Sequence, residues 1–326
     1  MSTLSPALDL FLYQFLRFFN PRQGYCWIYL AGGLFFALCV MLWRRRNRSR
    51  IRARPFLRLL GSRALWLHRS TLLDVKLYFL HGVLVLIAYG MFEATSEIWR
   101  AGAASALAAL AGAEPRLHAP HAIVGSLTTM LQIIALDLGY WALHYCFHKV
   151  PVLWELHKVH HSAEVMTPLS EWRQHPFEFI AFANVLTMTT GSVYGAMSWL
   201  FGAAAQPFTL FQINALFVMH LLTFHHLRHS GVWIAATGGL GRVFHSPAHH
   251  QIHHSTDPRH FDRNLGYALS IWDWAFGTLC VPERPLKVHF GVAGEPPYRG
   301  MADTLIRPLV AAAAKLQFAL VPGRRL

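Results

Sequence analysis

The chain has 326 residues, of which 54% are hydrophobic and only 14% are charged. This composition is that of a membrane protein and disfavours the alternative of a soluble all-α enzyme with buried apolar helices. The net charge of +13 does not indicate nucleic-acid binding, because seven of the arginines are concentrated in residues 44–54 and no base-stacking or groove-reading motif accompanies them.

Five apolar runs predict membrane-spanning helices, since about 20 apolar residues cross roughly 30 Å of hydrocarbon as a helix. These are residues 25–43, 77–92, 123–141, 177–201 and 208–224. The arginine cluster directly after the first run indicates the cytoplasmic end of that helix and would attract anionic lipid headgroups. Counting crossings from there, the segments after about residue 141 and after about residue 224 both reach the cytoplasmic face.

Two further segments have their own signals. The alanine-rich stretch at residues 101–113 is too short to span a bilayer, and we expect a loop or interfacial helix there. Residues 302–320 predict a membrane-surface helix kinked at Pro308.

Histidines dominate the chemistry of the sequence, and 16 of the 21 lie between His144 and His260. On a helix, residues three and four apart share one face with Cβ atoms about 5–6 Å apart, so each regularly spaced box should aim two or three imidazoles at a common point. HYCFH supplies His144 and His148, HKVHH supplies His157, His160 and His161, HHLRH supplies His225 and His229 beside His226, and HQIHH supplies His250, His253 and His254.

Local signals favour helices around these boxes. Pro151 should stop the preceding helix just past His148, and Ser246 followed by Pro247 is a good N-cap and first-turn pair leading into HQIHH.

Packing so many neutral imidazoles together is unfavourable unless something binds their lone pairs, and iron, zinc and copper all do so. Eight to ten ligands are too many for one ion and suit two. The motif H-E-x-x-H and any E-x-x-H pair are absent, which disfavours a metalloprotease and a carboxylate-rich di-iron bundle.

The motifs HYCFH, HKVHHSAEVMTPLSEWRQHP and SPAHHQIHHSTDPRHFDRNLG, followed by LSIWDWAFGTL, resemble the sterol desaturase/fatty acid hydroxylase superfamily over roughly residues 125–282. The resemblance implies an all-α, multi-pass integral membrane bundle with a cytoplasmic histidine-rich di-metal cap. It also implies an oxidoreductase in which two iron ions use O₂ to hydroxylate or desaturate a membrane lipid, with electrons from a separate donor protein. This chain departs from the family pattern at Leu265, where a tyrosine is common, and at Gly231.

The resemblance also implies the ligands and the domain organisation. The motif positions are His144, His148, His157, His160, His161, His250, His253 and His254, with His229 as a further family histidine and His225 added by its spacing. We expect N-terminal membrane helices and a basic loop at residues 1–120, the catalytic domain at 121–285 and a membrane-surface tail at 286–326.

Residues outside the boxes are candidates for orienting the ligands. Asp137 shares a helix face with His144 and His148, and we expect it to accept an N–H from a ligand histidine, although a helix-packing role is the alternative. Asn264, like Asp257, Asp262 and Asp273, is a weaker candidate for orienting HQIHH. The roles of His175, His226, His245 and His249 stay open.

Trp141, Trp154 and Trp172 either line an apolar substrate channel or anchor helices at the membrane interface. A non-catalytic membrane protein that binds or transports a metal is the rival function. A transporter would place its ligands at mid-membrane, whereas these gather at helix ends. The sequence does not select the lipid, nor hydroxylation over desaturation.

Overall fold

The computed structural model describes residue 12 and residues 15–46, 61–91 and 96–320, and it is mostly helical, as predicted. The long helices are α2 (Trp27–Arg46), α5 (Arg69–Met91), α6 (Ser96–Ala111), α7 (His121–Lys149), α9 (Pro176–Phe201) and α15 (Met301–Leu320). The shorter ones are α4 (Arg63–Trp66), α8 (Pro151–His161), α10 (Ala215–His220), α11 (His226–Arg228), α12 (Gly238–Val243), α13 (Pro247–His253) and α14 (Ile271–Phe276). Single turns are η1 (Pro168–Trp172), η2 (Gly202–Ala205), η3 (Leu221–His225) and η4 (Pro258–His260), and β1 (Thr209–Leu210) pairs antiparallel with β2 (Ile213–Asn214).

Two of the described helices are long and apolar enough to cross a membrane. They are the stretch Trp27–Arg44 within α2 and the whole of α7, His121–Lys149. These helices coincide with the first and third predicted spans. Most of the arginine cluster, from residue 47 onward, lies outside the described residues.

The fifth predicted span is wrong as a continuous helix. Residues 209–214 form the β1–β2 hairpin, and helix begins only at Ala215. The helical stretch through α10, η3 and α11 ends at Arg228. Its 14 residues, 215–228, extend about 21 Å at 1.5 Å per residue, which is shorter than a bilayer core.

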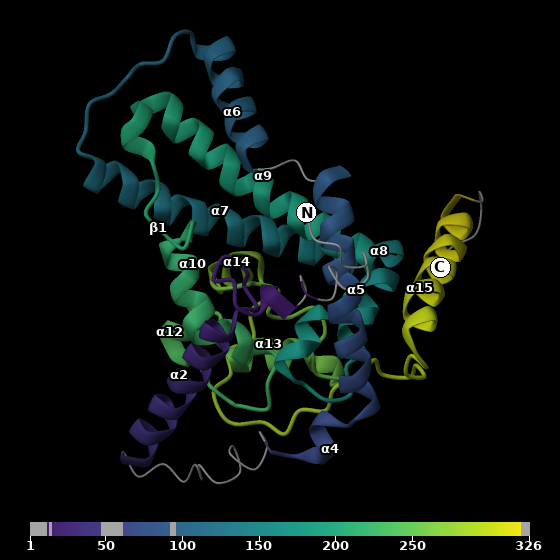
Figure 1. The fold of residues 1–326 in the computed structure, drawn as a ribbon. Helices are drawn as coiled ribbons and strands as arrows, with labels where there is room; N and C mark the ends of the chain where they lie inside the picture. Colours follow the sequence, from purple (N-terminus) through teal and green to yellow (C-terminus); the bar gives the residue numbers. More distant parts are fainter. Residues whose placement is uncertain (1–11, 13–14, 47–60, 92–95, 321–326) are drawn as a thin grey trace.

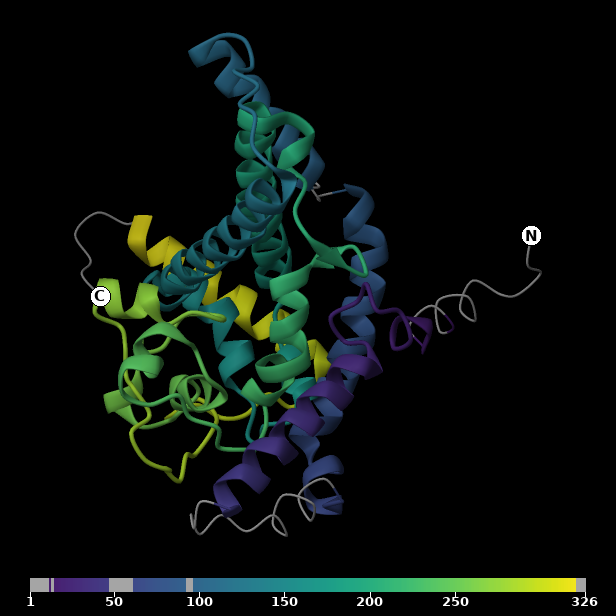
Figure 2. The ribbon, with the colours of Figure 1, turned by 90° about the vertical axis from the view of Figure 1, so that its left-hand side faces the viewer.

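The alanine-rich stretch forms the body of α6, which packs along α9 instead of standing alone. A Cβ added to Gly191 or Gly195 of α9 would lie within 2.3 Å of a carbonyl oxygen of α6, that of Ser96 or Arg100 respectively. Glycine therefore permits the two backbones to touch, as small residues do between membrane helices. With antiparallel α7 beside them, these helices extend away from the rest of the fold (Figures 1 and 2).

The helix boundaries predicted around the histidine boxes are confirmed. Helix α7 ends at Lys149, and Pro151 occupies the first turn of α8. Ser246 caps α13, and its backbone N–H and hydroxyl both contact Nδ1 of His249. The C-terminal helix α15 is continuous through Pro308 and lies against α8 (Figure 1).

Candidate metal centre

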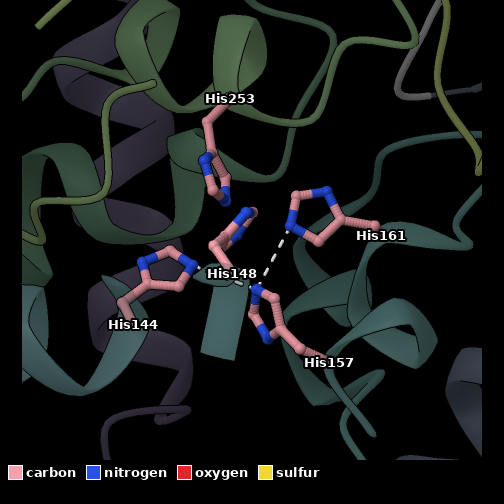
Figure 3. Close-up of side chains that lie close together, drawn as sticks. All are labelled: His144, His148, His157, His161 and His253. Atoms are coloured by element: carbon pink, nitrogen blue, oxygen red, sulfur yellow. Dashed lines mark hydrogen bonds between the residues drawn. The ribbon is translucent and has the colours of Figure 1, made fainter. Parts of the chain in front are cut away.

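The histidine boxes converge into two adjacent groups of buried imidazoles. Site 1 consists of His144, His148, His157, His161 and His253, and site 2 consists of His160, His229, His250 and His254. Within each site one nitrogen of every ring lies within 4.8 Å of the corresponding nitrogen of every other ring. Figure 3 shows the rings of site 1, from three separate chain segments, turned toward a common space.

Four of the five Nδ1 atoms of site 1, those of His144, His148, His157 and His253, lie beside acceptors at its edge. A single loop, residues 262–265, serves three of the rings. The His144 Nδ1–H donates to the carbonyl of Leu265 at 2.8 Å, and the His253 Nδ1–H donates to the carbonyl of Arg263 at 2.9 Å. Nδ1 of His148 lies 3.2 Å from a carboxylate oxygen of Asp262.

The fourth ring of site 1 is oriented from a different element. Nδ1 of His157 lies 2.9 Å from Oε1 of the buried Glu178, in the first turn of α9. Metal-bound histidines characteristically donate their outer N–H to a carboxylate or a backbone carbonyl, which fixes the tautomer and leaves the inner nitrogen as a ligand.

Within each site, Nε2 atoms of neighbouring rings face one another at the separation expected for two ligands of one metal ion. In site 1, Nε2 of His157 lies 3.0 Å from Nε2 of His144 and 3.2 Å from Nε2 of His161. In site 2, Nε2 of His250 lies 3.0 Å from Nε2 of both His229 and His254. Two nitrogens about 2.1 Å from one ion and at right angles to each other are about 3 Å apart.

The tautomers of site 1 suit a transition-metal ion, as does that of His160 in site 2, whose Nδ1–H donates to the carbonyl of Arg173 at 3.2 Å. A neutral imidazole that donates through Nδ1 carries only a lone pair at Nε2, so facing Nε2 atoms cannot satisfy one another. The buried Nε2 atoms of His148 and His253 have no hydrogen-bond partner among the described residues. Burial lowers the pKa of His157, His161 and His253 well below the usual imidazole value, which keeps the rings neutral and able to bind a cation.

Each H-x-x-H-H box divides between the two sites. In HKVHH the i, i+4 pair His157 and His161 belongs to site 1, while His160 belongs to site 2. HQIHH is reversed, because His250 and His254 belong to site 2 and His253 to site 1. The expectation of a common point holds for these i, i+4 pairs and for His144 and His148 of HYCFH in site 1, but the third histidine of each H-x-x-H-H box joins the other site.

His225 lies outside both sites, contrary to the expectation from its spacing to His229. Its Nδ1 lies 2.7 Å from the hydroxyl of Tyr267, and its Nε2 lies 3.0 Å from a carboxylate oxygen of Glu171. The i, i+4 rule assumes a regular helix, but η3 is a π turn and His229 follows the last helical residue. These two irregularities turn His225 and His229 in different directions.

Asp137 and Asn264 orient the ligands only indirectly. Asp137 accepts the backbone N–H groups of Tyr267, Ala268 and Leu269 at 2.6–3.2 Å, instead of an N–H from a histidine ring. Asn264 donates to the backbone carbonyls of His249 and Cys280 and accepts the N–H of Cys280. Both residues fix the segment whose carbonyls orient site 1.

Four histidines had no role assigned from the sequence, and all of them lie outside sites 1 and 2: His175, His226, His245 and His249. Both His175 and His249 act at helix N-termini: His175 caps α9 and His249 completes the capping box of α13. His226 lies close to Glu171 and His225, and its Nε2–H donates to the carbonyl of Gly24 at 3.0 Å. His245 is fully buried, with Nδ1 3.9 Å from a carboxylate oxygen of Asp273.

Sequence reasoning missed Glu178 and Arg228 as residues of this region. Glu178 had a detectable signal, because it is an acidic residue within a predicted span. Arg228 immediately precedes His229 and is only 1% exposed. Its Nη2 lies 3.4 Å from Nδ1 of His250.

A cavity reaches each site. One of about 320 Å³ is bordered by His148, His161 and His253 of site 1 together with Trp154. The other, of about 340 Å³, is bordered by His160 and His229 of site 2 and by Trp172. Trp141 has a different role, since its indole N–H donates to Asp273 at 3.2 Å.

Comparison with known proteins finds similar proteins for the region that contains the two sites. The model of the fatty acid hydroxylase family matches residues 129–278. The alkylglycerol monooxygenase of Danio rerio is 30% identical over 169 residues, which cover 51% of this chain and 33% of that protein. The human alkylglycerol monooxygenase is 30% identical over 148 residues, which cover 44% of this chain and 29% of that protein.

A bacterial relative matches a similar length. The ornithine lipid hydroxylase OlsE of Rhizobium tropici is 27% identical over 169 residues, which cover 51% of this chain and 46% of that protein. The matched stretch thus spans less than half the length of each of these relatives. No solved structure matches the chain. The matched residues contain every histidine of sites 1 and 2, and over this region the chain is similar to the fatty acid hydroxylase family, which supports the resemblance to the sterol desaturase/fatty acid hydroxylase superfamily.

Proposed function

We propose that the protein is an O₂-dependent lipid hydroxylase with one iron ion in site 1 and one in site 2. The observation that carries this proposal is the pair of adjacent, buried, all-histidine sites inside a fatty acid hydroxylase domain. The ligands are the nine histidines of the two sites, and His225 is no longer among them.

Iron at these sites would supply the activation of O₂ and the oxidation of a C–H bond. The protein's own residues have simpler tasks. Glu178 and the loop 262–265 hold four ligand rings in the tautomer that binds metal. The burial of the ligands excludes bulk water from the centre.

The proposed substrate is a membrane lipid, as the names of the relatives suggest. The cavity beside site 2 has the walls that a lipid chain requires. Phe179, Phe182 and Leu186 of α9 face Phe217 of α10 across it. Electrons would come from a separate donor protein.

We propose a multi-pass membrane protein with both sites near the cytoplasmic surface. The end of α2 supports this orientation, because Arg44 donates to the carbonyl of Trp233 at 3.1 Å, four residues after His229 of site 2. The basic cluster that begins at Arg44 would then contact anionic headgroups of the same leaflet. Labelling from one side of sealed vesicles should modify residues introduced at both Lys149 and Arg259, whose side chains are exposed, and labelling of the two from opposite sides would refute the orientation.

The domain proposal keeps residues 121–285 as the catalytic unit and 286–326 as a surface tail. Helix α15 of this tail is tied to α8 by an ion pair between Lys315 and Glu155. Its exposed Ile306, Leu309 and Val310 would face the lipid headgroup region.

The decisive experiment is lipid mass spectrometry of cells that express the wild type or His157→Ala. The wild type should add the mass of one oxygen atom to a lipid, whereas the loss of two hydrogens would indicate desaturation. His157→Ala should abolish the change, and His289→Ala, an exposed histidine outside both sites, should keep it. Full activity in His157→Ala would refute the ligand assignment.

A further inference from the structure

The cavity beside site 2 is bordered by charged and polar groups as well as by apolar side chains. Arg228, Glu171 and His225 border it together with His160 and His229 of site 2. A cavity for a plain hydrocarbon chain would not need buried charges, because each costs free energy unless it is paired.

Among these groups, Arg228 has the largest free-energy cost of burial. Its side chain is 1% exposed, and its guanidinium lies 4.3 Å above the ring of Tyr267. Among the described residues only Nη2 lies within hydrogen-bonding distance of other groups, the Tyr140 hydroxyl and Nδ1 of His250, both at 3.4 Å. The contact with His250 is not a hydrogen bond when that ring binds metal through Nε2, because Nδ1 then carries the proton. The buried Nε and Nη1 have no hydrogen-bond partner, and among the described residues no carboxylate oxygen lies within 4 Å of the guanidinium.

Glu171 contributes a carboxylate group to the lining of the same cavity. The Tyr267 hydroxyl lies 2.7 Å from Nδ1 of His225 and donates to it, which leaves the ring's N–H at Nε2, 3.0 Å from Oε2 of Glu171. Despite this short distance, Oε2 of Glu171 has no hydrogen-bond partner of good geometry among the described residues. Glu171 can therefore accept a hydrogen bond from a bound molecule.

The charges also limit what can bind between them. A third metal ion at Glu171, His225 and His226 is disfavoured, because the guanidinium of Arg228 is close enough to oppose a positive charge on His225. A group with negative charge alone would leave Glu171 without a donor, although Arg17 and Arg228 border the same cavity. The pair suits a group that accepts from Arg228 and donates to Glu171.

We propose that Arg228 and Glu171 form a headgroup subsite for a lipid that carries both an oxygen acceptor and an O–H or N–H donor. The inference rests on the lipid substrate proposed above. Because His160 and His229 border the same cavity, the oxidised carbon lies within a few bonds of the headgroup. The apolar part of the lining, which includes Phe179 and Leu186 of α9 and Phe217 of α10, would contact the chain.

The test is equilibrium binding to the full-length, iron-loaded protein in nanodiscs without O₂, so that no turnover is required. The probes are 1-O-hexadecylglycerol, an ornithine lipid, hexadecanoic acid and hexadecane. The wild type should bind one of the first two at least about tenfold more tightly than hexadecane, because hexadecane forms no hydrogen bond to either charged group. The preferred probe identifies a neutral polyol or a zwitterionic headgroup.

The variants separate the two halves of the subsite. Glu171→Gln should weaken binding of the preferred probe about tenfold and tighten binding of hexadecanoic acid, because the negative charge of Glu171 is removed. Arg228→Lys should weaken binding of both the preferred probe and hexadecanoic acid, since an ammonium cannot replace the planar guanidinium. Glu164→Gln is a matched change at a glutamate that pairs with Arg69 at the surface, and it should change neither of these two affinities.

Metal content and thermal unfolding verify that each variant is intact. Unchanged affinities in intact Glu171→Gln and Arg228→Lys would overturn the subsite, and so would a third bound ion that is lost in Glu171→Gln. Headgroup-selective binding without any lipid oxidation by the wild type would refute the proposed function and leave the subsite standing.

Discussion

Glu178 of α9 lies 2.9 Å from Nδ1 of His157, so a carboxylate outside every histidine box orients a ring at the centre of site 1. Replacing it with leucine should reduce the affinity of site 1 for metal by about 10–100-fold, the usual effect of losing such a partner. Glu178→Gln should restore part of that affinity, because its amide oxygen still accepts. Chelator competition measures both variants against Glu97→Gln, an exposed control, and wild-type affinity in the leucine variant would contradict the assignment.

The division of each box between two sites predicts different effects for neighbouring residues. His160→Ala removes a ligand from site 2 only, and His161→Ala removes one from site 1 only. Each variant should lose metal selectively from one site, so that the bound iron falls from about two ions toward one, and the double variant should lose both. Elemental analysis with iron spectroscopy checks this, and identical spectra for the two single variants would refute the separation.

Asp137 is expected to control the segment that orients site 1. Asp137→Asn replaces one acceptor oxygen by an N–H donor facing the backbone N–H groups of residues 267–269. The free energy of unfolding should fall by about 1–3 kcal/mol, because a buried donor loses its acceptor. Hydrogen exchange at these three amides should accelerate, and equally protected amides would show that the contact is dispensable. Asp303→Asn, on the C-terminal helix, is the control.

The contact between α6 and α9 depends on glycine. Gly191→Ala places a methyl group 2.3 Å from the carbonyl oxygen of Ser96, so the helices must separate. Destabilisation of about 1–3 kcal/mol is expected from such overpacking. Gly102→Ala is the matched control, since nothing lies within 4 Å of its added Cβ and alanine favours a helix by about 1 kcal/mol. Thermal unfolding compares the two, and equal melting temperatures would contradict the packing.

The attachment of α15 to α8 should weaken in acid. Burial raises the pKa of Glu155, but hydrogen bonds from Lys158 and Lys315 outweigh it and hold the pKa below its ordinary value. A carboxylate whose pKa is lower in the folded state stabilises that state above the unfolded pKa of about 4.3 and loses this contribution as the pH falls through the folded pKa. Proteolysis of the α15 connection should therefore increase below about pH 4. Glu155→Gln should already be sensitive at neutral pH and should show a smaller change with pH, and a wild-type pH profile in that variant would refute the contact.

Much of the centre could be predicted because its signals are local. The i, i+3, i+4 spacing of HKVHH and HQIHH identifies ligand clusters, and Pro151 and the Ser246–Pro247 pair set the nearby helix boundaries. These features depend on interactions within one or two helical turns. The mostly helical fold follows from the apolar runs for the same reason.

The tertiary structure alone decided which histidine belongs to which site. Spacing could not reveal the π turn that separates His225 from His229, nor that His160 and His253 join the opposite site from their box neighbours. The outer partners Glu178 and Leu265 are 21 and 121 residues away from the rings that they orient. Periodicity describes only neighbours along a helix, whereas a metal centre is defined by nitrogen atoms that distant segments bring within a few ångströms of each other.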